Sequence, residues 1–105
     1  MALALVVTHV LRPGHEQEFD ALVARTLADI RVLEPGTLVY ISHAVDGDPL
    51  QRVFYELYRD RAAFEAHEEH VHVRAFLEER AEHVASVEVT FLDAVAAHAA
   101  PTSIP

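Results

Sequence analysis

Hydrophobic side chains follow two different spacings along this chain, and these spacings predict its elements. Residues 2–11 are apolar at both even and odd positions, which predicts a strand with both of its faces covered. After the turn residues Arg12-Pro13-Gly14, a long stretch shows helical spacing. Its inward positions are Phe19, Leu22, Val23, Thr26, Leu27, Ile30 and Leu33. Glu34-Pro35-Gly36 ends this helix, because proline disfavours helical geometry at the residue before it and glycine frees the turn.

The second half of the chain predicts three more strands and a broken helix. Residues 37–45 and 52–59 alternate, and Asp46-Gly47-Asp48-Pro49 between them is typical of a hairpin connection. Asp60 is a good N-cap for a helix that is interrupted near its middle and then resumes. Residues 85–93 alternate again and predict the last strand.

The resulting order, strand-helix-strand-strand-helix-strand, indicates an α+β domain. It is a split βαβ arrangement with a four-stranded antiparallel sheet and helices on one face. Because the strands are apolar on both faces, the open face needs a second sheet, and another copy of the chain is the simplest source. We therefore expect residues 1–94 to form one domain that pairs as a homodimer. The small-residue-rich tail, residues 95–105, is expected to pack on the partner or to be disordered.

Composition limits the possible partners. The formal charge is −9, from 17 acidic and 8 basic side chains, so we expect neither nucleic acid nor an anionic membrane as partner. The absence of cysteine excludes a disulfide scaffold, a thiol nucleophile and a zinc finger. The opening MALALVV is too short to span a bilayer and has no basic leader region. We expect a soluble, cytoplasmic protein.

Candidate chemistry gathers around Glu56. This carboxylate lies between Phe54 and Tyr58 on one strand face, where it must pair, accept hydrogen bonds or stay protonated. The helix that follows brings Phe64 and His67 onto one side, and a strand usually packs against the next helix. We therefore expect His67 to lean over Glu56, which would orient it.

Two interpretations of this pair stay open. A histidine oriented by Glu56 and set among aromatic rings could remove a proton from a hydrophobic, weakly acidic substrate. Phe64, Phe76 and Tyr58 would supply those rings. Alternatively, Glu56 bonds to a tyrosine hydroxyl or a histidine and only fixes the core.

The remaining histidines fall into three groups. His9 and His43 alternate with apolar strand residues and are candidates to line a cavity or the dimer seam. We place the others, His15, His83 and His98, at the surface. His67, His70 and His72 are close in sequence, but His67 and His72 point about 140° apart on a continuous helix, and HEEH is not HExxH. We therefore expect no metal site, and the lack of a phosphate-cradling glycine loop indicates no flavin.

Two stretches, EPGTLVYISH and YELYRDRAAFEAHEEHVHVRAF, closely resemble the antibiotic biosynthesis monooxygenase domain, in particular its small quinol-monooxygenase-like members. The resemblance covers nearly the whole chain in order. The family pattern falls on Glu34-Pro35-Gly36, Tyr40, Glu56, Tyr58, Asp60, His67 and His72. It implies a ferredoxin-like fold that forms a dimeric α+β barrel. Val71 stands where proline is usual and Tyr58 where tryptophan is common, which implies a pocket of different shape. The chain has no asparagine or tryptophan, so haem degradation is not expected.

The resemblance also implies an activity. Oxygenases of this kind act on phenols or quinols without flavin, haem or metal, because an electron-rich phenolate can itself reduce dioxygen. By position, His67 or His72 would be the base, Glu56 the orienting group, and Tyr40 or Tyr58 a hydrogen-bond donor. The expected substrate is a small hydrophobic aromatic, a quinol or a polyketide-like compound. The alternatives are an isomerase of a small carbonyl compound, or a protein of the same fold that only binds a small ligand or serves in stress.

Overall fold

Residues 2–98 are described by the structure, a computed structural model, and their elements follow the predicted order. The elements are β1 (Leu3–Leu11), α1 (Glu16–Leu33), β2 (Thr37–Val45), β3 (Asp48–Tyr58), α2 (Arg61–Glu69), α3 (Val71–Glu79), the short 3-10 turn η1 (Arg80–Glu82) and β4 (Val84–Leu92). The hairpin is tighter than predicted, because Gly47 takes a φ of +80° and β3 begins directly after it.

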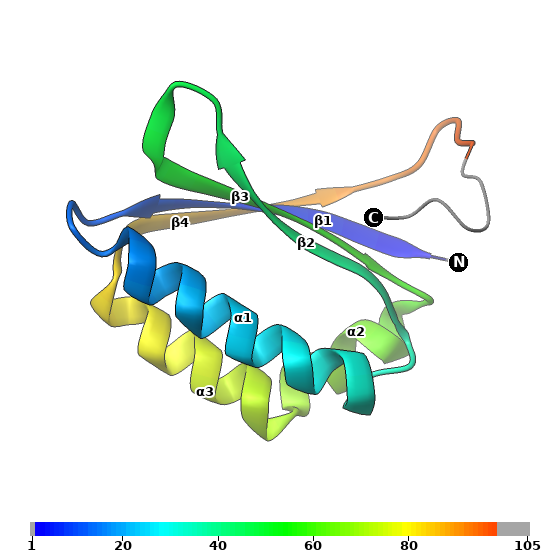
Figure 1. Cartoon of the computed structure of the whole chain (residues 1–105). Helices are drawn as coiled ribbons and strands as arrows, with labels where there is room; N and C mark the ends of the chain where they lie inside the picture. The colour runs from blue at the N-terminus through cyan, green and yellow to red at the C-terminus, as the bar shows by residue number, and fades with distance from the viewer. Residues whose placement is uncertain (1, 99–105) are drawn as a thin grey trace.

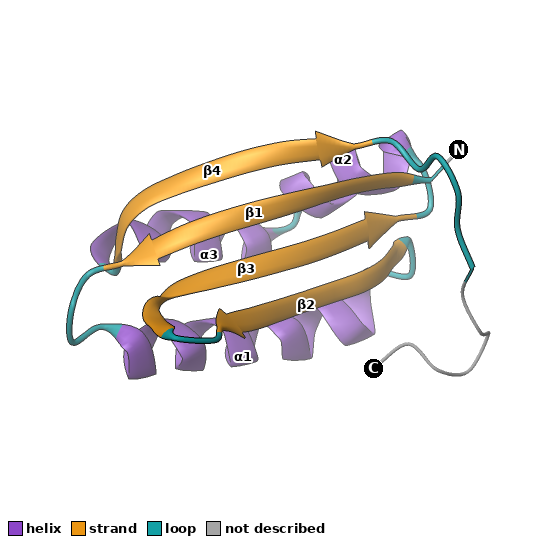
Figure 2. Ribbon diagram, turned by 90° about the horizontal axis from the view of Figure 1, so that it is seen from above, coloured by secondary structure: helices purple, strands orange, loops and turns teal. Residues whose placement is uncertain are grey.

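The four strands form one antiparallel sheet in the order β2-β3-β1-β4 (Figure 2). All three α-helices of the described residues lie on the same face of this sheet (Figure 1). The predicted ferredoxin-like α+β fold is confirmed.

The break between α2 and α3 lies at His70. Asp60 caps α2 as predicted, since its carboxylate accepts a hydrogen bond from the Ala63 amide at 2.8 Å. His70 then takes an extended conformation, with φ −64° and ψ 140°, which ends α2 and starts α3 in a new direction. The predicted broken helix is confirmed.

The turn after α1 is held tightly against α2. A Cβ atom on Gly36 would lie only 2.6 Å from the Cβ of Ala63, so only glycine allows this approach. The Gly36 carbonyl also accepts a hydrogen bond from the Arg59 amide at 2.9 Å. These contacts fix the position of Glu34, two residues earlier, relative to α2.

The hydrophobic core lies between the sheet and the helices. Its largest fully buried side chains are Tyr58, Phe19, Phe54, Leu11 and His9. His83, predicted at the surface, is buried instead, and its Nδ1 lies 3.0 Å from Nδ1 of His15. The reason is a backbone contact. The Arg12 amide donates to the His83 carbonyl at 2.8 Å, which brings the turn after β1 next to the turn before β4.

The other face of the sheet carries a row of half-buried apolar side chains. They include Val6, Val10, Ile41, Val53, Tyr55 and Leu57. No element within residues 2–98 covers this face (Figure 1), which is the pattern from which the homodimer was predicted. The dimer stays a prediction.

The chain beyond β4 has no regular structure as far as residue 98, and its side chains there are exposed. The predicted C-terminal arm lies mostly outside the described residues. Every helix within residues 2–98 is too short or too polar to cross a lipid bilayer.

Candidate functional site

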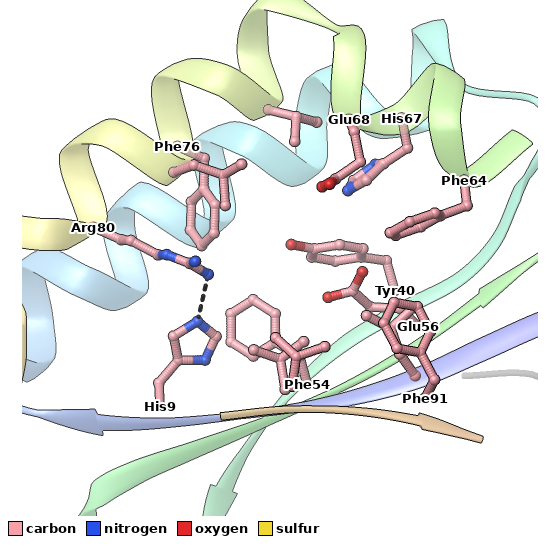
Figure 3. Close-up of a pocket in the computed structure, with 15 residues that line it drawn as sticks. His9, Tyr40, Phe54, Glu56, Phe64, His67, Glu68, Phe76, Arg80 and Phe91 are labelled. Atoms are coloured by element: carbon pink, nitrogen blue, oxygen red, sulfur yellow. Dashed lines mark hydrogen bonds between the residues drawn. The ribbon is translucent and has the colours of Figure 1, made fainter. Parts of the chain in front are cut away.

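A cavity of about 360 Å³ lies between the helix-covered face of the sheet and α2 and α3 (Figure 3). Leucine, valine and phenylalanine side chains make up most of its wall, including Phe64 and Phe76 as predicted. The polar residues in the wall are His9, Tyr40, Glu56, His67, Glu68 and Arg80. The cavity is therefore apolar, with a few polar groups that could orient a ligand, as is usual for small-molecule sites.

His67 is held by Glu34. Nδ1 of His67 lies 2.6 Å from Oε1 of Glu34, and both side chains are buried, with 4% and 3% of their surface exposed. The Thr37 hydroxyl donates to the same oxygen at 2.6 Å, and Nε2 of His72 bonds to Oε2. Three donors thus converge on one buried carboxylate.

These hydrogen bonds keep Glu34 ionised and decide which nitrogen of the His67 ring carries a hydrogen. Burial alone would raise the pKa of Glu34, but the hydrogen bonds from His67, Thr37 and His72 lower it to about 2. The carboxylate is therefore ionised at neutral pH and can only accept, so Nδ1 of neutral His67 carries the hydrogen. The lone pair is then on Nε2, which makes no hydrogen bond within residues 2–98, and the ring lines the cavity. His67 has the arrangement of a general base.

The predicted pairing of Glu56 with His67 is wrong. The Tyr58 hydroxyl donates to Glu56 Oε1 at 2.5 Å, because the two side chains lie two residues apart on one face of β3. Burial raises the pKa of Glu56, and the hydrogen bond from Tyr58 only partly opposes this. Glu56 still lines the cavity, but the carboxylate that orients His67 is Glu34.

The two candidate tyrosines differ in position. Tyr58 is fully buried, is not part of the cavity wall, and has its hydroxyl bonded to Glu56. Tyr40 lines the cavity, and its ring centroid lies 5.6 Å from that of His67. Burial, and next the charge of Glu56, raise the pKa of Tyr40 well above its ordinary value. Tyr40 therefore keeps its proton and can donate a hydrogen bond into the cavity.

His9 lines the cavity as predicted, but His43 does not. His9 Nε2 lies 3.1 Å from a guanidinium nitrogen of Arg80. Burial, and next the charge of Arg80, lower the pKa of His9 to about 4, against a smaller opposing effect of the Arg52 backbone. His9 is therefore neutral and accepts this hydrogen bond. His43 is exposed on the open face of the sheet, since it pairs with Val53, and its Nδ1 bonds to the Val53 carbonyl at 2.8 Å.

His72 does not line the cavity either. Its Nε2 donates to ionised Glu34, so it supports that carboxylate from outside the cavity. Within residues 2–98, no group of three or more histidine, aspartate or glutamate side chains is arranged to hold a metal ion.

Glu34, which bonds to His67, and the cavity-lining Glu68 and Arg80 were not among the site residues predicted from the sequence. A signal for Glu34 was present, because a carboxylate at the C-terminal end of a helix is disfavoured by the helix dipole and needs a reason. Arg80 likewise follows Val73, Phe76 and Leu77 along an otherwise apolar stripe. A charge at such a position points to a partner or a site.

Comparisons with known proteins agree with this fold. The family model described as antibiotic biosynthesis monooxygenase matches residues 2–79. A comparison with curated proteins finds no match. Among solved structures, PA3566 from Pseudomonas aeruginosa is 27% identical over 90% of this chain and 95% of its own, with a TM-score of 0.82. Rv0793 from Mycobacterium tuberculosis is 23% identical over 94% of this chain and 100% of its own, with a TM-score of 0.85. An antibiotic biosynthesis monooxygenase is 25% identical over 90% of this chain and 99% of its own, with a TM-score of 0.81. Since the family model spans most of the sequence and the fold is shared, the chain belongs to the antibiotic biosynthesis monooxygenase family.

Proposed function

We propose that this protein is a cofactor-independent monooxygenase that oxygenates a small aromatic, quinol or polyketide-like phenol in the cavity between sheet and helices. Family membership supports a general monooxygenase-type activity. The observation that carries the finer proposal is the buried Glu34–His67 pair, which leaves a basic nitrogen on a mostly apolar cavity.

The first step is removal of the phenolic proton by Nε2 of His67. Ionised Glu34 keeps the ring in the required tautomer and stabilises the imidazolium that forms. The Tyr40 hydroxyl donates a hydrogen bond to the oxygen anion of the substrate. The apolar wall excludes water, which strengthens both electrostatic interactions.

The phenolate is then electron-rich enough to reduce dioxygen. One oxygen atom bonds to a ring carbon of the substrate and becomes a carbonyl oxygen. The other oxygen atom leaves as water with the two hydrogens that the substrate loses, so a phenol becomes a quinone. The substrate supplies all of the electrons, and no further reductant enters the balance.

We also propose that two copies of the chain pair through the open face of the sheet. The half-buried apolar side chains on this face support the proposal, since a monomer would leave them in contact with water. The cavity lies on the opposite face of each sheet, so each copy would carry its own site.

Oxygen uptake tests the proposed activity. Chelator-treated protein is mixed with a panel of hydroquinones in ¹⁸O-labelled dioxygen, and His67→Ala is compared with the control Arg74→Ala on the exposed surface of α3. We expect uptake that is lost in His67→Ala only, and one labelled oxygen in a hydroxyquinone product, since oxygenation adds a third oxygen to a hydroquinone. Substrate conversion without oxygen uptake would support the isomerase alternative, and binding without conversion would support a ligand-binding protein.

A further inference from the structure

Arg80 and His9 form a second polar cluster in the cavity wall, apart from His67. Arg80, in η1 directly after α3, extends its guanidinium into the cavity beside His9, while His67 approaches from α2 (Figure 3). The Arg80 guanidinium carbon lies 5.8 Å from the centre of the Phe76 ring, and one guanidinium nitrogen donates to His9 at 3.1 Å. The phenylalanine and the histidine thus hold the guanidinium in one orientation.

Arg80 has no carboxylate partner among the described residues. Four of the eight arginines form an ion pair within residues 2–98, namely Arg25, Arg52, Arg59 and Arg74. Of the four that form none, Arg12, Arg31 and Arg61 are exposed, whereas Arg80 is half-buried. The Arg80 side chain has lost part of its contact with water, and this burial lowers its pKa. The nearby charges of Glu56 and Glu68 favour the cation but form no ion pair with it, so most of its N–H donors still need acceptors.

His9 explains the orientation of Arg80 but does not balance its charge. Neutral His9 accepts one of the five guanidinium N–H groups. The other donors of Arg80 make no hydrogen bond within residues 2–98. His9 Nδ1, itself fully buried, also lacks a partner there. Spare donors on a planar guanidinium match a carboxylate, which can accept two of them side by side.

The other charged side chains in the cavity wall limit which type of anion Arg80 can bind. Glu56 and Glu68 line the same cavity, and both are close enough for their charges to act on Arg80. A doubly charged phosphate would be repelled by them more strongly than a singly charged carboxylate. The surroundings of Arg80 therefore favour a carboxylate.

We propose that Arg80, positioned by His9 and Phe76, binds the carboxylate of an aromatic acid whose reactive hydroxyl lies at His67. This inference rests on the proposed function and narrows its substrate class to hydroxylated aromatic acids. Arg80 is a binding residue in this scheme, and His67 remains the base.

Binding without turnover tests the carboxylate site directly. Calorimetry compares 2,5-dimethoxybenzoate, which has no reactive hydroxyl, with its methyl ester. We expect the acid to bind the natural protein tenfold to a hundredfold more tightly, the range of a charge-assisted hydrogen-bonded pair. Arg80→Gln should bind acid and ester alike, whereas the control Arg74→Gln, on exposed α3 surface, should keep the preference. Equal binding of acid and ester by the natural protein would overturn the proposal, as would an unchanged preference in Arg80→Gln.

Two further measurements cover the case in which Arg80→Gln does not fold and the choice between a carboxylate and a phosphate. If Arg80→Gln does not fold, Arg80→Lys replaces it, and the acid preference should fall but persist, because lysine keeps the charge without the planar fork. An unchanged preference in Arg80→Lys would also contradict the proposal. Competition with phenyl phosphate should be weaker than with benzoate, and stronger competition would overturn the choice of a carboxylate.

Oxygen uptake with 2,5-dihydroxybenzoate and its methyl ester separates failure of this inference from failure of the proposed function. A preference for the acid in uptake supports both proposals. Uptake that is equal for acid and ester contradicts the carboxylate site alone. Tight binding of the dimethoxy acid with no uptake from any hydroquinone contradicts the monooxygenase proposal and supports the carboxylate site.

Discussion

His67 and Glu34 lie 33 positions apart in the chain, yet a hydrogen bond of 2.6 Å joins Nδ1 of the imidazole to the carboxylate. The contact forms where the end of α1 meets the last turn of α2, and Gly36 allows the close approach. The five predictions that follow concern this pair, the cavity and the open face of the sheet.

Glu34→Gln should lower turnover by about 10²-fold, because a neutral amide neither fixes the His67 tautomer nor stabilises the imidazolium. His67→Ala should cost at least as much, and the double variant should be little worse than either single change, since the two residues act as a unit. Steady-state rates per folded molecule test this. Additive losses would contradict a shared role.

Glu56→Gln should behave differently. The Tyr58 hydroxyl can still donate to the amide oxygen, so the free energy of unfolding should change by about 1 kcal/mol or less. Because Glu56 and His67 have different hydrogen-bond partners, the rate effect of Glu56→Gln should largely multiply with that of His67→Ala in the double variant. Rates and urea unfolding on one set of variants check both points, and strong coupling between Glu56 and His67 would contradict the structure.

Acid should destabilise the protein in two windows. The folded-state pKa of His9 is lowered from 6.5 to about 4, so the unfolded chain binds more protons and stability falls as the pH drops from 6.5 to 4. Glu34, lowered from 4.5 to about 2, adds a second loss as the pH falls from 4.5 to 2. Each full loss is of order 3 kcal/mol.

A comparison of the natural protein with His9→Gln isolates the loss of stability between pH 6.5 and pH 4. The raised pKa of Glu56 acts in the opposite direction, since the folded state then binds its proton more readily as the pH falls. The difference in unfolding free energy between the natural protein and His9→Gln therefore measures the His9 contribution. It should shrink between pH 7 and pH 4, and a constant difference would contradict the lowered pKa.

Gly36→Ala should disturb the Glu34–His67 pair indirectly, by displacing the turn that follows Glu34. The new methyl group would lie 2.6 Å from the Ala63 Cβ, which forces the turn away from α2 and costs about 1–3 kcal/mol. Turnover should fall as well, because Glu34 moves with this turn. Gly14→Ala is the control, with open space around its Cβ but a φ of +86°, and it should lower stability without lowering the rate of the folded protein.

Sedimentation should give about twice the chain mass of 11.7 kDa at micromolar concentration. Leu57→Lys on the open face should shift the protein to monomers, whereas Val71→Lys, where the side chain is 83% exposed on α3, should not. A soluble monomer for the natural chain would overturn the proposed dimer.

Local patterns in the sequence were sufficient for the fold. Alternation placed the strands, and Asp60 marked the start of α2, because both signals depend only on neighbours in the chain. The Glu34–His67 contact depends instead on how two distant helix ends meet, and no local spacing contains that information. Glu56 was predicted as the partner of His67 because it is near in sequence and on the strand before α2. His43 was an avoidable error, since Tyr40 and His43 have opposite parity on β2 and face opposite sides of the sheet.

The backbone break at His70 divides the cavity wall between two helices. His67 lies on α2, while Arg80 follows the far end of α3, so one extended residue sets the distance between them. The angle between α2 and α3 at His70 therefore determines how far apart His67 and Arg80 lie. A change of angle at His70 would change the length of substrate that fits, but it would also strain the Glu34–His72 hydrogen bond or the His9–Arg80 contact, so these two contacts hold the cavity at one length.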